Sequence, residues 1–281
     1  MSHFTVIVFG DDVDGQLAPY NENTQTEEAY FKETAERTAE RGREKLAAKG
    51  IANPSLEQIA KELSCDGDTF EVRDGKLGYL STYNPESKWD WYTTGGRWTG
   101  YFPMKPGRRG KTGEPGIMTE VAKPGYADIA RLKDIDIERA RNEAAKEAGE
   151  SFAHWKTIYE KHGRPESWSS IRDSGIDIEK ARQLYHAQPA IKTSDEARLC
   201  FMDCPVELFG FDQVSYIMDS MDYALVPFAF ILRGEWHERG KMGWWACVSD
   251  EKDEALWGAH FHKVLREQDP DTLLTLVDCH I

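Results

Sequence analysis

The sequence lacks several features that would assign it to a class at once. Its 281 residues contain no apolar run long enough to cross a bilayer. The five cysteines stand at irregular spacings, so we expect reduced thiols and no zinc site. No P-loop, Rossmann glycine pattern or serine nucleophile elbow is present. The sequence therefore predicts a globular protein without a membrane span, and it gives no reason to expect a cofactor.

Positive charge is also scarce. The chain has 35 Lys and Arg residues against 49 Asp and Glu, which gives a net charge of −14. Broad binding to duplex DNA requires basic surfaces, so this balance argues against it. The first ten residues lack the basic segment of a signal peptide and are typical of a strand. We therefore expect a cytoplasmic protein that does not bind duplex DNA directly.

Aromatic residues are concentrated between residues 83 and 102, which hold three of the nine tryptophans. The Gly95-Gly96 pair predicts a turn between two aromatic strands, and hence a hairpin. One interpretation is a small aromatic core closed by an ion pair between Asp90 and Arg97. The other is a pocket in which Trp or Tyr stacks on a flat ligand while Arg97 binds an anion bidentately. We expect the three tryptophans of this stretch to be largely buried.

A Pro- and Gly-rich loop follows over residues 103 to 125, and it carries the only compact basic cluster of the sequence. Beside the aromatic stretch, this cluster could bind the anionic half of a ligand. The exposed flexible loop is the alternative. The predicted ligand is a nucleotide-like small molecule or a protein partner. The candidate binding residues are Trp89, Trp91, Tyr92, Arg97, Trp98, Lys105, Arg108 and Arg109.

Strand patterns occur at both ends of the chain, over residues 3 to 9, 227 to 233, 243 to 249 and 272 to 281, with a helix over 253 to 268. Further helices are expected over 26 to 49, 56 to 63, 136 to 161 and 178 to 186, and short strands over 69 to 72 and 76 to 81, joined to the preceding helix by a turn at 65 to 68. The fold class predicted is α+β, an antiparallel sheet with covering helices, ferredoxin-like elements and a helical insertion. Residues 1–127 and 224–281 would form the core domain, with central terminal strands, and residues 128–223 the insertion.

An enzymatic alternative rests on the carboxylates Asp11, Asp12 and Asp14, which follow the first predicted strand. Carboxylate oxygens are suited to a divalent cation, and His3 or His280 could join them if the terminal strands pair. The run from Asp12 to Gly15 resembles the first motif of haloacid-dehalogenase-like phosphatases. The sequence departs from that family at Gln16 and lacks its alternation of strands and helices. A metal-dependent hydrolase is therefore kept as the alternative function.

Three blocks together resemble one family. They are the start at residues 2 to 8, the block from Tyr83 to Trp98 with its pattern Ser-Lys-Trp-Asp-Trp-Tyr-x-x-Gly-Gly-Arg-Trp, and the end from Thr272 to Ile281. The chain resembles an uncharacterised family of bacteriophage, prophage and actinobacterial proteins. The resemblance implies an accessory protein that acts in the host cytoplasm on host physiology or host defence. It contributes no catalytic residues.

Overall fold

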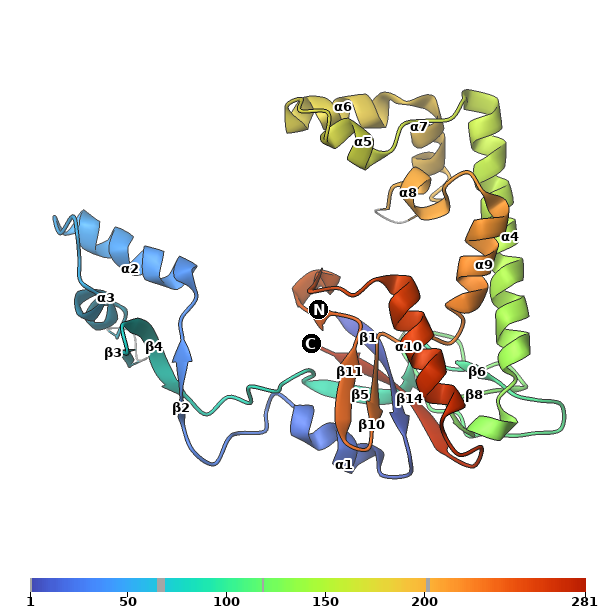
Figure 1. Cartoon of the computed structure of the whole chain (residues 1–281), viewed down its shortest axis with the longest axis horizontal. Helices are drawn as coiled ribbons and strands as arrows, with labels where there is room; N and C mark the ends of the chain where they lie inside the picture. The colour runs from blue at the N-terminus through green and yellow to red at the C-terminus, as the bar shows by residue number, and fades with distance from the viewer. Residues whose placement is uncertain (1, 65–68, 118, 201–202) are drawn as a thin grey trace. The chain divides into compact units, whose positions relative to one another are not determined.

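The computed structural model describes residues 2–64, 69–117, 119–200 and 203–281 (Figure 1). Its contacts divide the chain into two compact units, which are described separately. Unit 1 consists of Met1–Gln16 and Tyr92–Ile281, and unit 2 of Leu17–Trp91. The fold is α+β, as the sequence predicted. The turn expected over 65 to 68 lies outside the described residues.

Unit 1 is built on a mixed sheet of seven strands in the order β11-β10-β1-β14-β5-β7, with β9 paired to β14. Its strands are β1 (His3–Phe9), β5 (Trp91–Gly96), β7 (Glu114–Pro115), β9 (Ile129–Arg131), β10 (Ala229–Leu232), β11 (Glu235–Glu238) and β14 (Leu273–His280). β1 and β14 are central and pair antiparallel along their length, which confirms that the terminal strands share one sheet. Two short pairs accompany the sheet, β6 (Phe102–Pro103) with β8 (Tyr126–Ala127) and β12 (Lys241–Met242) with β13 (Val248–Ser249).

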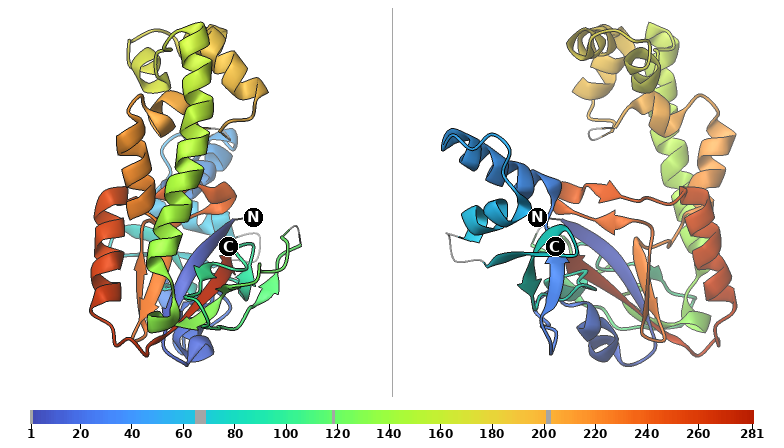
Figure 2. Two further views of the ribbon diagram at one scale, coloured as in Figure 1. Left: turned by 90° about the vertical axis from the view of Figure 1, so that its right-hand side faces the viewer. Right: turned by 60° about the vertical axis from the view of Figure 1, so that its left-hand side comes forward.

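The core of unit 1 lies between this sheet and helix α10 (Glu254–Arg266). Residues that lie opposite each other on paired strands point to the same face, so Ile7 on β1 and Leu276 on β14 share one face of the sheet. Trp257 and Phe261 of α10 pack against that face and are almost fully buried. Figure 2 shows α10 lying along the sheet. Of the strand expected over 243 to 249, only Val248–Ser249 (β13) is a strand, because the residues before it turn through the 3₁₀ segment η4 (Trp244–Ala246) between β12 and β13.

A helical segment leaves the sheet and returns to it at β10. Its helices are α4 (Ile137–His162), α5 (Trp168–Arg172), α6 (Ile178–Ala187), α7 (Pro189–Glu196), α8 (Pro205–Phe209) and α9 (Gln213–Asp222). Asp136 caps α4 by accepting the N–H of Arg139 at 3.0 Å. Phe152 and Trp155 of α4 form a second core with the helices that follow. The boundary expected at residue 128 falls inside the sheet, because β9 pairs with β14 before the 3₁₀ segment η3 (Leu132–Asp134).

Unit 2 has a small core of its own, although its residues were expected in the same domain as the terminal strands. Its elements are η1 (Ala18–Tyr20), β2 (Tyr30–Glu33), α2 (Glu36–Ala48), α3 (Leu56–Leu63), β3 (Phe70–Arg73) and β4 (Lys76–Ser81). Ile59 and Leu63 of α3 pack with Leu77 of β4. The helix predicted to begin at Thr26 begins ten residues later, because residues 30 to 33 pair with β4 as a strand. The short helix α1 (Val13–Leu17) ends at the boundary between the units.

Candidate functional site

The aromatic stretch does not fold as a hairpin. Gly95 and Gly96 are the last residues of strand β5, and the chain then turns, with the N–H of Trp98 donating to the carbonyl of Gly95 at 3.0 Å. Both glycines have positive φ, 81° and 54°, a conformation in which L side chains are strained. Residues 97 to 101 form a turn instead of the second strand that the sequence predicted. The glycine pair therefore ends a strand of the central sheet.

The reason for this turn is a buried carboxylate from the last strand. Oδ2 of Asp278, a residue that is 2% exposed, accepts the N–H of Arg97 at 2.9 Å. A Cβ atom on Gly96 would lie 2.4 Å from the Cβ of Asp278, closer than two carbon atoms can approach. Glycine is thus required at position 96 by a residue 182 positions away in the sequence.

A second buried carboxylate, Asp128, fastens two loops to each other. Its Oδ1 accepts the N–H groups of Gly100 at 2.6 Å and Tyr101 at 3.2 Å. Its Oδ2 accepts the N–H of Gly113 at 2.7 Å, and its backbone N–H donates to the carbonyl of Lys111 at 2.9 Å. Asp128 is fully buried, and hydrogen bonds to a buried carboxylate are stronger than those between neutral groups. The turn that carries Arg97 and the end of the basic loop are therefore held by one side chain.

Asp278 is also the point at which the three distinctive sequence blocks meet. Nδ1 of His3 lies 2.8 Å from Oδ1 of Asp278, and the rings of His3 and His280 lie edge to face with centroids 4.9 Å apart. A carboxylate oxygen beside Nδ1 favours the tautomer in which that nitrogen carries the proton. This pairing orients His3 as carboxylates orient histidines in acid–base sites. It also joins the ends of β1 and β14.

The aromatic residues predicted to bind a ligand are divided between the two units. Trp89 of unit 2 is buried, and its Nε1 donates to the carbonyl of Leu17 at 3.2 Å. Trp91, also in unit 2, is 46% exposed, so the expectation that it is largely buried is wrong. In unit 1, Trp98 is half-buried against the core.

Tyr92 and Asp90 form hydrogen bonds with residues other than Arg97. The hydroxyl of Tyr92 donates to Asp14, and burial followed by this bond raises the pKa of Tyr92 well above its usual range. Asp90 accepts the N–H of Trp91 at 2.7 Å. The side chain of Arg97 is exposed and takes part in none of the ion pairs formed by the described residues.

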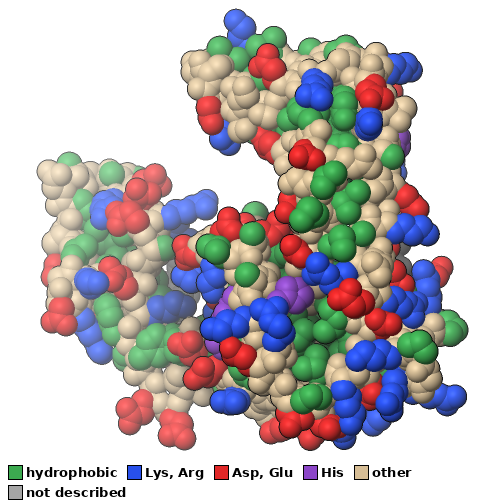
Figure 3. Space-filling model, turned by 45° about the vertical axis from the view of Figure 1, so that its right-hand side comes forward, with side chains coloured by type: hydrophobic (Ala, Val, Ile, Leu, Met, Phe, Trp, Pro, Cys, Tyr) green, Lys and Arg blue, Asp and Glu red, His purple; other side chains and the backbone are tan. Residues whose placement is uncertain are grey.

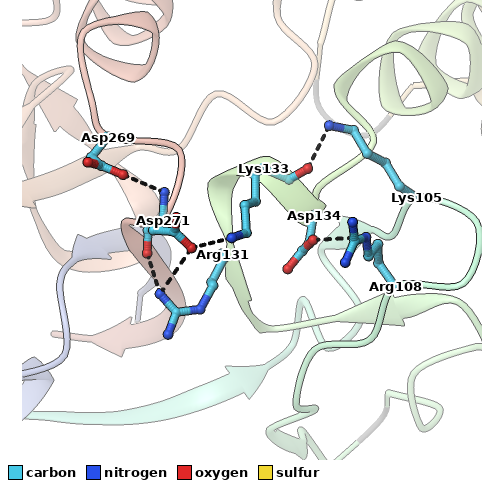
Figure 4. Close-up of polar contacts among 7 residues, drawn as sticks. All are labelled: Lys105, Arg108, Arg131, Lys133, Asp134, Asp269 and Asp271. Atoms are coloured by element: carbon cyan, nitrogen blue, oxygen red, sulfur yellow. Dashed lines mark hydrogen bonds and ion pairs between the residues drawn. The ribbon is translucent and has the colours of Figure 1, made fainter.

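The basic loop lies against η3, and Figure 4 shows its contacts there. Lys105 donates from Nζ to the carbonyl of Lys133 at 2.6 Å, and its N–H donates to the carbonyl of Asp134. Nε of Arg108 lies 3.3 Å from Oδ1 of Asp134. These contacts bring Lys133 and Arg131, which the sequence had placed in the helical insertion, next to the loop.

Lys133 and Arg131 share one carboxylate, that of Asp271, which precedes β14 (Figure 4). Nζ of Lys133 donates to Oδ1 of Asp271, and Nη1 of Arg131 lies 3.6 Å from the same oxygen. The N–H of Asp271 donates to Asp269 at 2.8 Å. All of these pairs are exposed, so each contributes little to the stability of the fold.

Arg109 and Lys111 differ from their neighbours. Both are exposed, and neither takes part in an ion pair within the described residues.

We call the six cations of this region the basic surface: Lys105, Arg108, Arg109, Lys111, Arg131 and Lys133. Figure 3 shows Lys and Arg side chains gathered in the lower right part of its view.

The carboxylates of the enzymatic alternative have structural partners. Asp12 accepts the N–H of Gly15 at 2.9 Å at the start of α1, and Asp14 accepts from Tyr92. Asp11 and Asp12 line an open hollow of about 510 Å³, together with Gln16 and Arg233. Among the described residues, no three His, Cys, Asp or Glu side chains lie close enough to hold a metal ion. The structure therefore does not gather these carboxylates with a histidine.

Sequence reasoning missed the residues that organise the site. Asp128 appears in the sequence as a single acid beside a strand and Asp278 as a single acid within one, and only the folded sheet brings them to the glycine turn. Arg131, Lys133 and Asp271 were missed for the same reason. A charged residue inside a strongly apolar strand, as Asp278 is, was the one available signal.

Comparison with known proteins identifies no relatives. No family model matches the chain, and no curated protein or solved structure is significantly similar to it. No helix within the described residues has both the length and the apolar character needed to cross a membrane.

Proposed function

We propose that this protein binds a phosphate-bearing, nucleotide-like anion on the basic surface of unit 1. The observation that carries the proposal is that Arg109 and Lys111 are exposed and have no ion-pair partner among the described residues. These two cations project from a loop fastened by a buried carboxylate, and no ion pair of the described residues uses them. In the host setting that the family resemblance implies, the anion would be a host metabolite or signal.

The charge distribution supports this choice. Across the whole chain acids outnumber bases, yet the basic surface gathers six cations, three of which contact the carboxylates of Asp134 and Asp271. A local excess of positive charge in an acidic protein attracts small anions while the rest of the surface repels long polyanions. A compact phosphate ligand fits this pattern better than duplex DNA does.

Preorganisation supports it further. The backbone of Lys111 is bonded to Asp128 and Ile129 by three hydrogen bonds of 2.9 Å. Ordering a loop before a ligand arrives removes part of the entropic cost of binding. Because Asp128 is occupied by backbone N–H groups, its charge fixes the loop without pairing with the exposed side chains.

Recognition is proposed to act through the phosphates. Trp98 packs against the core and Trp89 is buried, so these indole rings contribute to stability instead of stacking on a ligand. Arginine binds phosphate oxygens bidentately, a role open to Arg97, Arg108 and Arg109.

Thermal unfolding in the presence of nucleoside mono-, di- and triphosphates, cyclic nucleotides and pyrophosphate tests the proposal. A ligand at 100 times its dissociation constant stabilises a protein by about 2.7 kcal/mol. We expect a hit that is lost in the double variant Arg109→Ala/Lys111→Ala. The matched control is Lys180→Ala/Lys192→Ala, which removes two exposed cations of the helical segment. Absence of any hit, or equal loss in both variants, would contradict the proposal.

A further inference from the structure

The six cations of the basic surface are not equally available. Arg131 and Lys133 both contact the carboxylate of Asp271, and Arg108 lies beside Asp134. Arg109 and Lys111 belong to no ion pair of the described residues. An incoming anion therefore meets two available cations first, and it reaches the others only by displacing a carboxylate of the protein.

Asp271 is held in a defined position. Its N–H donates to Asp269 at 2.8 Å, and its carbonyl accepts from Nη1 of Arg131 at 2.7 Å. The preceding carbonyl, that of Pro270, accepts the N–H of Lys133 at 2.8 Å. The loop before β14 is thus fastened to η3 by its backbone, and the carboxylate of Asp271 stays next to the two cations.

The energies involved are small and comparable with those of a single phosphate contact. Exposed ion pairs of this kind contribute little, because water and salt screen them and the long side chains lose freedom. Asp271 is 57% exposed, so its carboxylate can leave without burying an unpaired charge. For an anion with one phosphate, the binding free energy gained at Arg131 and Lys133 is about equal to that lost when Asp271 is displaced. An anion with several phosphates also contacts Arg109 and Lys111, and these contacts add binding free energy.

We infer that Asp271 is the specificity-determining residue of the basic surface, and that it restricts this surface to anions carrying several phosphate groups. This inference rests on the proposed function and adds the class of ligand. The Lys133 ammonium, and then the Arg131 guanidinium, hold the pKa of Asp271 below its usual range. Its carboxylate is therefore charged at neutral pH and competes with the ligand there.

Calorimetric titration with inorganic phosphate and with tripolyphosphate, at constant ionic strength, tests the inference. In the wild type we expect tripolyphosphate to bind more tightly than phosphate. Asp271→Asn should raise the affinity for phosphate by about 2–5-fold, the range expected from removing an exposed competitor. The affinity for tripolyphosphate should change less, so the ratio between the two probes should fall.

Asp250→Asn is the matched control, because Asp250 forms an exposed pair with Lys241 at 2.6 Å on the β12–β13 hairpin. It should leave both affinities unchanged. If tripolyphosphate binds but Asp271→Asn leaves the ratio at its wild-type value, the specificity role is refuted while the proposed function stands. If phosphate binds the wild type as tightly as tripolyphosphate, the inference also fails. If neither probe binds any variant, both proposals fall.

Discussion

Asp128 shows how one side chain can decide the shape of a surface. Its two carboxylate oxygens accept three backbone N–H groups from two loops, and no local sequence pattern announces this role. An asparagine has the same size but only one acceptor oxygen. Its NH₂ group would face either Gly113 or the pair Gly100 and Tyr101, placing a donor against a donor.

We therefore predict that Asp128→Asn lowers the free energy of unfolding by about 2–4 kcal/mol, since buried donors lose a charged acceptor. Urea denaturation measures the change. Asp136→Asn is the control, because Asp136 caps α4 through a bond to one residue and asparagine caps equally well. Equal stability of the two variants would show that the Asp128 bonds do not organise the loops.

The glycine turn gives a second prediction for a single residue. Gly96 and Gly107 both have positive φ, 54° and 75°, but only Gly96 has an atom of another residue in the way of a Cβ. Gly107→Ala should lower the free energy of unfolding by about 1–2 kcal/mol, because alanine is strained in the left-handed conformation but meets no other residue there. Gly96→Ala should cost about 3 kcal/mol or more, because the new methyl group overlaps Asp278. Thermal denaturation compares the two, and similar melting temperatures would contradict the close packing of Gly96 on Asp278.

Elements with a regular apolar pattern were predictable from sequence, whereas elements fixed by distant partners were not. The apolar runs of β1 and β14 predicted both strands and their place in one sheet, and Ser55 with Gln58 forms a capping box at the start of α3. The Gly95-Gly96 pair predicted a hairpin because local rules cannot see Asp278. For the candidate site, the basic loop was found as a cluster of like charges along the sequence. The cations on β9 and η3 were not, since only sheet pairing brings them to the loop.

Two partly buried histidines, His237 on β11 and His262 on α10, make the stability of unit 1 depend on pH. The ring of His237 stacks on Phe230 at 4.6 Å, and burial, followed by the nearby His260, lowers the pKa of His237. Lys252 lowers it further while Glu235 opposes the shift. Burial also lowers the pKa of His262, whose Nε2 lies 2.9 Å from the carbonyl of Asp222.

A histidine whose pKa is lower in the folded state contributes stability above its unfolded pKa, and this stability is lost as the pH falls through the folded value. We therefore expect the melting temperature to decrease between about pH 7 and pH 5, below the ordinary histidine pKa near 6.5. His237→Gln should reduce this decrease. His154→Gln, at an exposed position of α4, should not. A steeper pH dependence in His237→Gln would contradict the sign of the shift.

At the scale of the whole molecule, the basic surface belongs entirely to unit 1, and each unit has a hydrophobic core of its own. The boundaries of unit 2 at residues 17 and 91 were not predicted from the sequence. The apolar residues Ile59, Leu63 and Leu77 pack within unit 2, and Leu276 packs with α10 in unit 1. Two cores mean that a cavity made in one has no direct effect on the packing of the other.

We predict that Leu77→Ala and Leu276→Ala act on different parts of the chain. Each removes a buried leucine side chain and should cost about 2–5 kcal/mol in its own core. Hydrogen exchange followed by mass spectrometry reports local stability along the sequence. Leu77→Ala should speed exchange in β3, β4 and α3 while β1 and β14 stay protected, and Leu276→Ala should do the reverse. Faster exchange throughout the chain in either variant would mean that the two cores unfold as one cooperative structure, and ligand binding on unit 1 would then also protect unit 2.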